Sequence, residues 1–71
     1  MKLPRDLSGQ RVVRALKRLG FIQERQEGSH IRLVRGSPRV TMPAHRAIAP
    51  KTLQSILRQA QISVDELIGV L

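Results

Sequence analysis

Apolar residues near the start of the chain repeat at the spacing of one face of a helix: Val12, Leu16 and Leu19. Ser8 precedes them as a helix N-cap residue, and Gly20 follows as a helix stop. The pattern therefore predicts a helix over about 8–19, after which Phe21 folds back onto the last turn.

Turn residues divide the middle of the chain into three short segments, which we expect to form strands: 21–27, 30–35 and 39–42. The first segment is polar for a strand, and the turn residues Glu27-Gly28-Ser29 after it favour a β-hairpin. In the second segment Ile31 and Leu33 alternate with polar residues, which gives the sheet one apolar face. A second turn, Gly36-Ser37-Pro38, leads into the third strand.

The last third of the chain again has a helical pattern. Pro50 suits the first turn of a helix and follows a loop at 44–49. Apolar residues then recur at helical spacing: Leu53, Ile56, Leu57 and Ala60. Ser63 and Glu66 form a capping-box pattern that predicts a final short helix.

The order of these elements predicts an α+β fold, a two-layer sandwich of the α-β-β-β-α type with a short C-terminal helix. We expect a single domain over 1–71, with its core from about 8 to 62. Strand alternation places Ile31 and Leu33 against the helices and His30, Arg32 and Thr41 on the open face of the sheet.

The charge of the chain indicates an anionic partner. Thirteen Lys and Arg residues against five Asp and Glu give a net charge of +8 over 71 residues, and ten of the thirteen are arginine. Arginine pairs well with phosphate oxygens, so nucleic acid or an acidic protein is the expected partner.

Several classes of protein are excluded or disfavoured by composition. The chain has no cysteine, which removes disulfides and thiolate metal sites. Its five acidic residues are scattered, so we expect no metal site and no cofactor. Residues 1–6 carry no apolar run typical of a secretory signal, and no segment approaches a membrane span, so a cytoplasmic protein that does not bind membranes is expected.

His30 is the main candidate for chemistry. Cleavage of RNA without a metal needs a base for the 2′-hydroxyl proton, an acid for the leaving oxygen, and cations for the charge that builds on phosphorus. Histidine exchanges protons near neutral pH and can serve as base or acid. The alternative is a surface histidine that helps to close the turn.

Other candidates for RNA contact each have a simpler structural interpretation. Gly28 permits a close backbone approach or only a tight turn, and Ser29 binds phosphate or only caps the strand. His45 is a second proton-transfer group, a phosphate ligand or a solvated loop residue. The remaining candidates are basic residues on the open face of the sheet and on polar helix faces, which are usually only solvated: Arg32, Arg11, Arg14, Arg18 and Lys51.

Several segments together resemble the HicA toxins, small ribonucleases of type II toxin–antitoxin systems. The matching pieces, in order, are Ala15-Leu16-Lys17-Arg18-Leu19-Gly20-Phe21, Gly28-Ser29-His30, Val40-Thr41-Met42-Pro43, His45 and Lys51-Thr52-Leu53 through Ala60. The resemblance implies a fold like the double-stranded-RNA-binding domain, cleavage of mRNA with His30 as the catalytic residue, and neutralisation by a HicB-type antitoxin. The sequence departs from this family at Gln61, where a glycine helix stop is common, and at Ile31 and Arg32, where many relatives have a second histidine or an aromatic residue.

Three functions therefore remain to be compared. The first is a metal-independent endoribonuclease toxin that acts through His30. The second is a non-catalytic RNA-binding module, which would recognise the shape of an RNA duplex through phosphates and 2′-hydroxyls. The third is a basic subunit that binds an acidic protein.

Overall fold

The structure is a computed structural model in which residue 4 and residues 6–71 are described; residues 1–3 and 5, part of the segment read above for a signal, lie outside the described residues. The chain opens with α1 (Gly9–Arg18). The hydroxyl oxygen of Ser8 caps this helix by accepting a 3.1 Å hydrogen bond from the backbone N–H of Arg11, as its sequence position predicts.

The end of α1 turns back on itself through Gly20, whose φ of +100° suits glycine. The N–H of Gly20 donates to the carbonyl of Lys17, and the N–H of Phe21 donates to the carbonyl of Leu16, both at 3.0 Å. This pair of bonds is a Schellman motif, and it directs the Phe21 ring into the core beside Leu16.

Three antiparallel strands in the order β1-β2-β3 form one sheet: β1 (Ile22–Glu27), β2 (His30–Val34) and β3 (Arg39–Pro43). A two-residue turn of Gly28 and Ser29 joins the first pair, and Gly28 has φ of +58°. Glycine with positive φ at this first central position is typical of type II′ hairpin turns.

A β-bulge in β1 changes which of its residues face the helices. Gln23 pairs with Leu33, and Gln26 pairs with Ile31, although residues three apart in a regular strand lie on opposite faces. Both glutamines therefore share the helix-facing side of the sheet with the buried Ile31 and Leu33. The sequence pattern did not reveal this bulge.

The second helix, α2 (Pro50–Ala60), begins with Pro50 in its first turn as expected. It ends with Gln61 in the left-handed conformation, φ 59° and ψ 41°, and the N–H of Ile62 donates to the carbonyl of Leu57 at 3.1 Å. The helix stop is therefore formed at Gln61 without the glycine. The short α3 (Val64–Ile68) follows, with both hydrogen bonds of the predicted Ser63–Glu66 capping box present.

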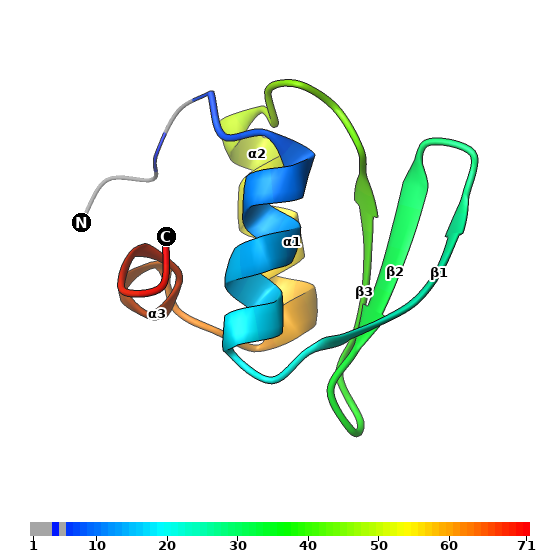
Figure 1. Ribbon diagram of the computed structural model, residues 1–71. Helices are drawn as coiled ribbons and strands as arrows, with labels where there is room; N and C mark the ends of the chain where they lie inside the picture. The colour runs from blue at the N-terminus through cyan, green and yellow to red at the C-terminus, as the bar shows by residue number, and fades with distance from the viewer. Residues whose placement is uncertain (1–3, 5) are drawn as a thin grey trace.

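The helices α1 and α2 cover one face of the sheet, and α3 lies on the far side of α1 from the sheet (Figure 1). The expected α+β fold, like that of the double-stranded-RNA-binding domain, is confirmed. The core is aliphatic apart from Phe21, and its buried members come from both layers: Leu7, Val12, Val13, Ala15, Leu16, Phe21, Ile31, Leu33, Val40, Met42, Ile48, Leu53, Ile56, Leu57, Ala60, Ile62 and Leu67. No residue of β1 belongs to it.

The segment between β3 and α2 closes one end of the sandwich. The carbonyl of His45 accepts a 2.8 Å hydrogen bond from the N–H of Gly9, the first residue of α1. The N–H of Ala44 donates to the carbonyl of Ser29 at 2.7 Å, so the same segment also holds the hairpin turn. A Cβ atom on Gly9 would lie 2.7 Å from the carbonyl oxygen of Pro43, which is closer than side chains approach backbone.

We expect Gly9→Ala to destabilise the protein, because the methyl group meets backbone that cannot move aside without breaking this closure. Overpacking of this kind costs about 1–3 kcal/mol. In a domain of this size each kcal/mol lowers Tm by about 4–8 °C. Gly69→Ala is the matched control, since its nearest added contact is an ordinary 3.4 Å. Equal Tm values for the two variants, measured by thermal unfolding, would contradict the role given to Gly9.

Gln61→Gly should have the opposite effect. A left-handed conformation costs a non-glycine residue about 1–2 kcal/mol, and glycine adopts it freely. Part of that gain is offset by the greater entropy of glycine in the unfolded chain, so we expect a net stabilisation of about 0.5–1 kcal/mol in denaturant unfolding. A loss of stability in this variant would show that the Gln61 side chain contributes more than its backbone strain.

Candidate functional site

Four of the predicted site residues, Gly28, Ser29, His30 and His45, belong to the end of the sheet where the β1–β2 turn lies beside the end of β3. Register places His30 between Glu27 on β1 and Pro43 on β3. The hydrogen bond from Ala44 to Ser29 joins the turn to the segment that carries His45. Gly28, Ser29, His30 and His45 are all exposed here, so a large ligand has access to them.

His30 is the first residue of β2, and its side chain is exposed while that of Ile31 is buried. This alternation directs the imidazole to the open face of the sheet, away from the helices, as the sequence predicts. Glu27 lies directly across the strand pair, where side chains on one face are about 5 Å apart at Cβ. The carboxylate of Glu27 is itself bound to Arg25 at 2.8 Å.

Arg32, two residues along β2, shares the open face with His30 and pairs across the strands with Arg25. Arg39 and Thr41 of β3 line a shallow hollow with Arg32 and Glu24. Each strand thus contributes one arginine to this face. Of these three arginines, the sequence analysis predicted only Arg32 on the open face. The alternation that places Thr41 there also places Arg39 there and could have identified it. The side to which Arg25 points could not be predicted, because the bulge breaks the alternation in β1.

The side chain of His45 belongs to a different part of the surface. It lines a hollow of about 250 Å³ with Ser8, Gln10, Ala44 and Arg46, at the start of α1. His30 is not among the residues that line this hollow. The two histidines therefore lie on neighbouring segments, and only His45 lines this hollow.

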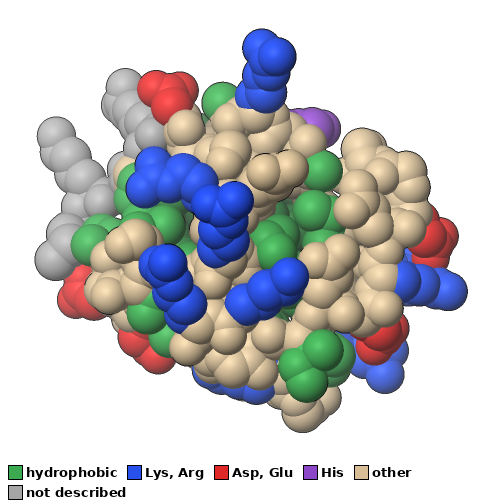
Figure 2. Space-filling view, viewed as in Figure 1, with side chains coloured by type: hydrophobic (Ala, Val, Ile, Leu, Met, Phe, Trp, Pro, Cys, Tyr) green, Lys and Arg blue, Asp and Glu red, His purple; other side chains and the backbone are tan. Residues whose placement is uncertain are grey.

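The helical stripe Arg11, Arg14 and Arg18 is exposed, but it faces the C-terminal end of the chain rather than the turn of the hairpin. All three line one hollow with Val70 and Leu71, and Arg18 donates a 2.6 Å hydrogen bond to the carbonyl of Val70. Figure 2 shows Lys and Arg side chains gathered over α1. The stripe is therefore a basic surface on α1, separate from the open face of the sheet that carries His30.

Two other cations have clear positions. Lys51 is exposed in the first turn of α2. Arg35 is structural, because its guanidinium donates to the carbonyl of Leu19 at 2.9 Å and lies 4.8 Å from the centre of the Phe21 ring. It links the end of α1 to the β2–β3 turn.

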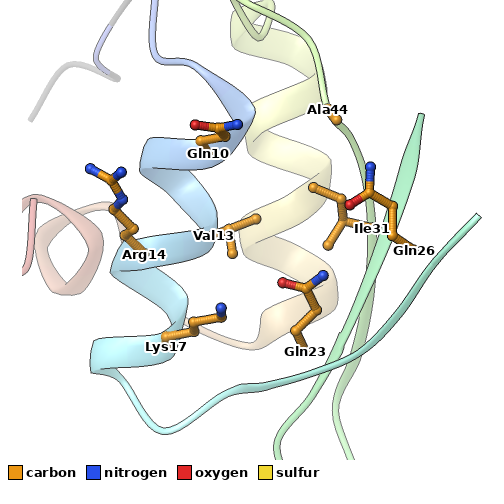
Figure 3. Close-up of a pocket in the computed structure, with 8 residues that line it drawn as sticks. All are labelled: Gln10, Val13, Arg14, Lys17, Gln23, Gln26, Ile31 and Ala44. Atoms are coloured by element: carbon orange, nitrogen blue, oxygen red, sulfur yellow. The ribbon is translucent and has the colours of Figure 1, made fainter. Parts of the chain in front are cut away.

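A further hollow of the surface was not anticipated from the sequence. It has a volume of about 290 Å³ and lies between α1 and the β1–β2 hairpin (Figure 3). Its lining combines glutamines, cations and apolar residues: Gln10, Val13, Arg14, Lys17, Gln23, Gln26, Ile31 and Ala44. The polar composition of β1 could have indicated this hollow, because the helix-facing side of the strand has no apolar side chains to fill the space against α1.

Among residue 4 and residues 6–71, no three His, Asp or Glu side chains are grouped so that they could hold a metal ion. Within the same residues, no helix is both long and apolar enough to cross a bilayer.

Comparison with known proteins identifies the family. The profile described as the HicA toxin of bacterial toxin–antitoxin systems matches residues 9–62, from the first residue of α1 to the second residue after α2. No curated protein sequence matches the chain significantly. Because the match covers most of the 71 residues, the chain belongs to the HicA toxin family of bacterial toxin–antitoxin systems.

Proposed function

We propose that this HicA-family protein is a metal-independent endoribonuclease that cleaves mRNA in the cytoplasm, with His30 as its catalytic residue. The observation that carries the proposal is the position of His30, exposed at the end of β2 beside the Gly28–Ser29 turn and on the same face as Arg32. An imidazole at such a place reaches a phosphodiester without leaving the strand that holds it.

The chemistry follows from these groups. The 2′-oxygen of a ribose attacks the adjacent phosphorus while its proton passes to a base, and the bond from phosphorus to the 5′-oxygen breaks as that oxygen gains a proton. His30 serves as base, as acid, or as both in turn. Arg32 and the exposed backbone of Gly28 and the hydroxyl of Ser29 stabilise the charge on the phosphorane oxygens.

The remaining basic residues bind the rest of the RNA strand. Arg11, Arg14 and Arg18 form a surface along α1, and His45 and Lys51 lie on the β3–α2 segment and at the start of α2. Charge on this scale attracts phosphates from a distance and also suits an acidic partner. A HicB-type antitoxin that covers His30 with acidic side chains would block RNA from reaching this residue and would neutralise the positive charge.

A non-catalytic RNA-binding module is the second candidate, and the fold favours it, because domains of this type bind RNA duplexes by shape. The sole aromatic residue, Phe21, is buried, so neither function relies on bases stacked on aromatic side chains. The two candidates differ in one respect, which is whether the bound RNA is cut.

His30→Ala should abolish cleavage of single-stranded RNA measured in EDTA, while the fold is kept because the side chain is exposed. Loss of a proton-transfer group lowers the rate by about 10²–10⁴-fold. His45→Ala, at a residue assigned to RNA binding and not to proton transfer, should lower the rate by less than about tenfold, since a positioned base or acid accounts for more than that. Equal cutting by the His30 variant and the unaltered protein would disprove the mechanism. RNA binding without any cutting by the unaltered protein would favour the binding module.

The arginine stripe should appear in the salt dependence of RNA binding. Each phosphate contact on a single strand contributes about 0.7 to the slope of log K against log salt concentration. Arg11→Ala and Arg14→Ala should each reduce that slope by about this amount, as measured by fluorescence anisotropy over a salt series. Arg58→Ala, an exposed arginine on α2, has the same effect on net charge and serves as control. An equal slope change in the control would mean that only net charge matters.

A further inference from the structure

We propose that the groove between α1 and β1 binds one unstacked nucleobase of a single-stranded RNA and thereby sets base preference next to the cleaved bond. The inference rests on the proposed function, because it assumes that RNA is the ligand of this surface. The residues that would read the base are Gln23 and Gln26, with Gln10 facing them from α1 (Figure 3).

The size and floor of the groove suit a base. Sites for drug-sized ligands have volumes of about 300–1,000 Å³, and this groove of about 290 Å³ is just below that range, as suits a ligand as small as one base. Its apolar lining comes from Val13, Ile31 and Ala44, which can contact the flat face of a ring. Bases in a duplex remain stacked and do not enter such a space, so the ligand is a single strand.

The polar lining suits the edge of a base. A glutamine carboxamide carries both a donor and an acceptor, and it can form two hydrogen bonds with one base edge. The Nε2 of Gln26 donates to the carbonyl of Gly28 at 3.1 Å, which fixes this side chain near the turn and leaves its Oε1 as an acceptor. The carboxamides of Gln10 and Gln23 make no hydrogen bond to other residues in the described part of the chain, so both can bind a ligand.

Lys17 supplies a cation at the rim. Figure 3 shows its ammonium group directed toward Gln23, whereas the guanidinium of Arg14 points away from β1. The phosphate next to a bound base would therefore meet Lys17 rather than Arg14. This arrangement separates a base-reading surface from the arginine stripe, although both are on α1.

The groove also has a fixed relation to His30. Gln26 pairs with Ile31, the neighbour of His30 in β2, but the two side chains lie on opposite faces of the sheet. An RNA strand whose base occupies the groove must pass over the Gly28–Ser29 turn to bring a phosphate to His30. The selected base is then close to the cleaved bond and on one side of it.

A purely structural origin for the groove is less consistent with the packing. The bulge places two polar side chains on the inner face of β1, and no residue of that strand is buried. Leucine at either position would bury apolar area against Val13 or Ile31, which stabilises by about 25 cal/mol per Å². The glutamines keep the groove open at a cost in stability.

The test uses nucleoside 5′-monophosphates as probes in an NMR titration, with ribose 5-phosphate as the probe that lacks a base. We expect at least one of the four nucleotides to shift the side-chain amide signals of Gln23 and Gln26 and the methyl signals of Ile31, while ribose 5-phosphate leaves them unchanged. Gln23→Leu and Gln26→Leu should lose this response. Gln54→Leu, on the exposed side of α2, should retain it. Equal shifts with ribose 5-phosphate, or none with any nucleotide, would overturn the inference.

Mapping of cut sites separates this inference from the proposed function. If the protein cuts RNA, the two groove variants should lose about tenfold in preference for the selected base, an amount typical of one well-formed pair of hydrogen bonds. If both variants cut RNA with an unchanged site preference, base binding in the groove is refuted and the proposed nuclease activity stands. If nucleotides give base-dependent NMR shifts but the protein cuts no RNA, the proposed nuclease activity is refuted and base binding in the groove stands.

Discussion

The segment between β3 and α2 is bonded to both the first helix and the hairpin turn, and the position of His30 follows from these bonds. Gly9 is bound to His45, Ala44 to Ser29, and Ile48 donates to the carbonyl of Leu7 at 2.7 Å. These bonds hold three segments that are distant in sequence, and the contact is possible because Gly9 lacks a Cβ atom. The bond from Ala44 to Ser29 fixes the turn before His30 against the segment that follows β3.

These bonds explain how the β1–β2 hairpin, which buries little apolar surface in β1, can hold His30 in a fixed position. β1 has no buried residue and is held to the molecule chiefly by its pairing with β2. Two-stranded hairpins are only marginally stable in water. Fixing the turn through Ala44 and the other end through Arg35 and Phe21 therefore gives His30 a defined position on an otherwise exposed element.

Local sequence signals predicted the elements well, because each depends on residues close together in the chain. Ser8, Gly20 and the Ser63–Glu66 pair mark helix ends, and alternation in β2 places His30 and Arg32 on the open face. Features that depend on register or on long-range contact could not be predicted. The bulge, the groove it opens and the separation of His45 from His30 belong to this second group.

The same physical distinction applies to the arginines. Composition indicates that the chain attracts phosphate, but only packing decides which of its ten arginines remain available for it. Arg35 is hydrogen-bonded to the carbonyl of Leu19 and lies over the Phe21 ring. Arg18 is hydrogen-bonded to the carbonyl of Val70. Arg32, in contrast, is exposed on the open face with His30. A uniform basic surface would bind RNA in many orientations. Under the proposed function, Arg32 on the open face and Lys17 at the rim of the glutamine groove would together direct an RNA strand across the hairpin turn, where one phosphate would reach His30.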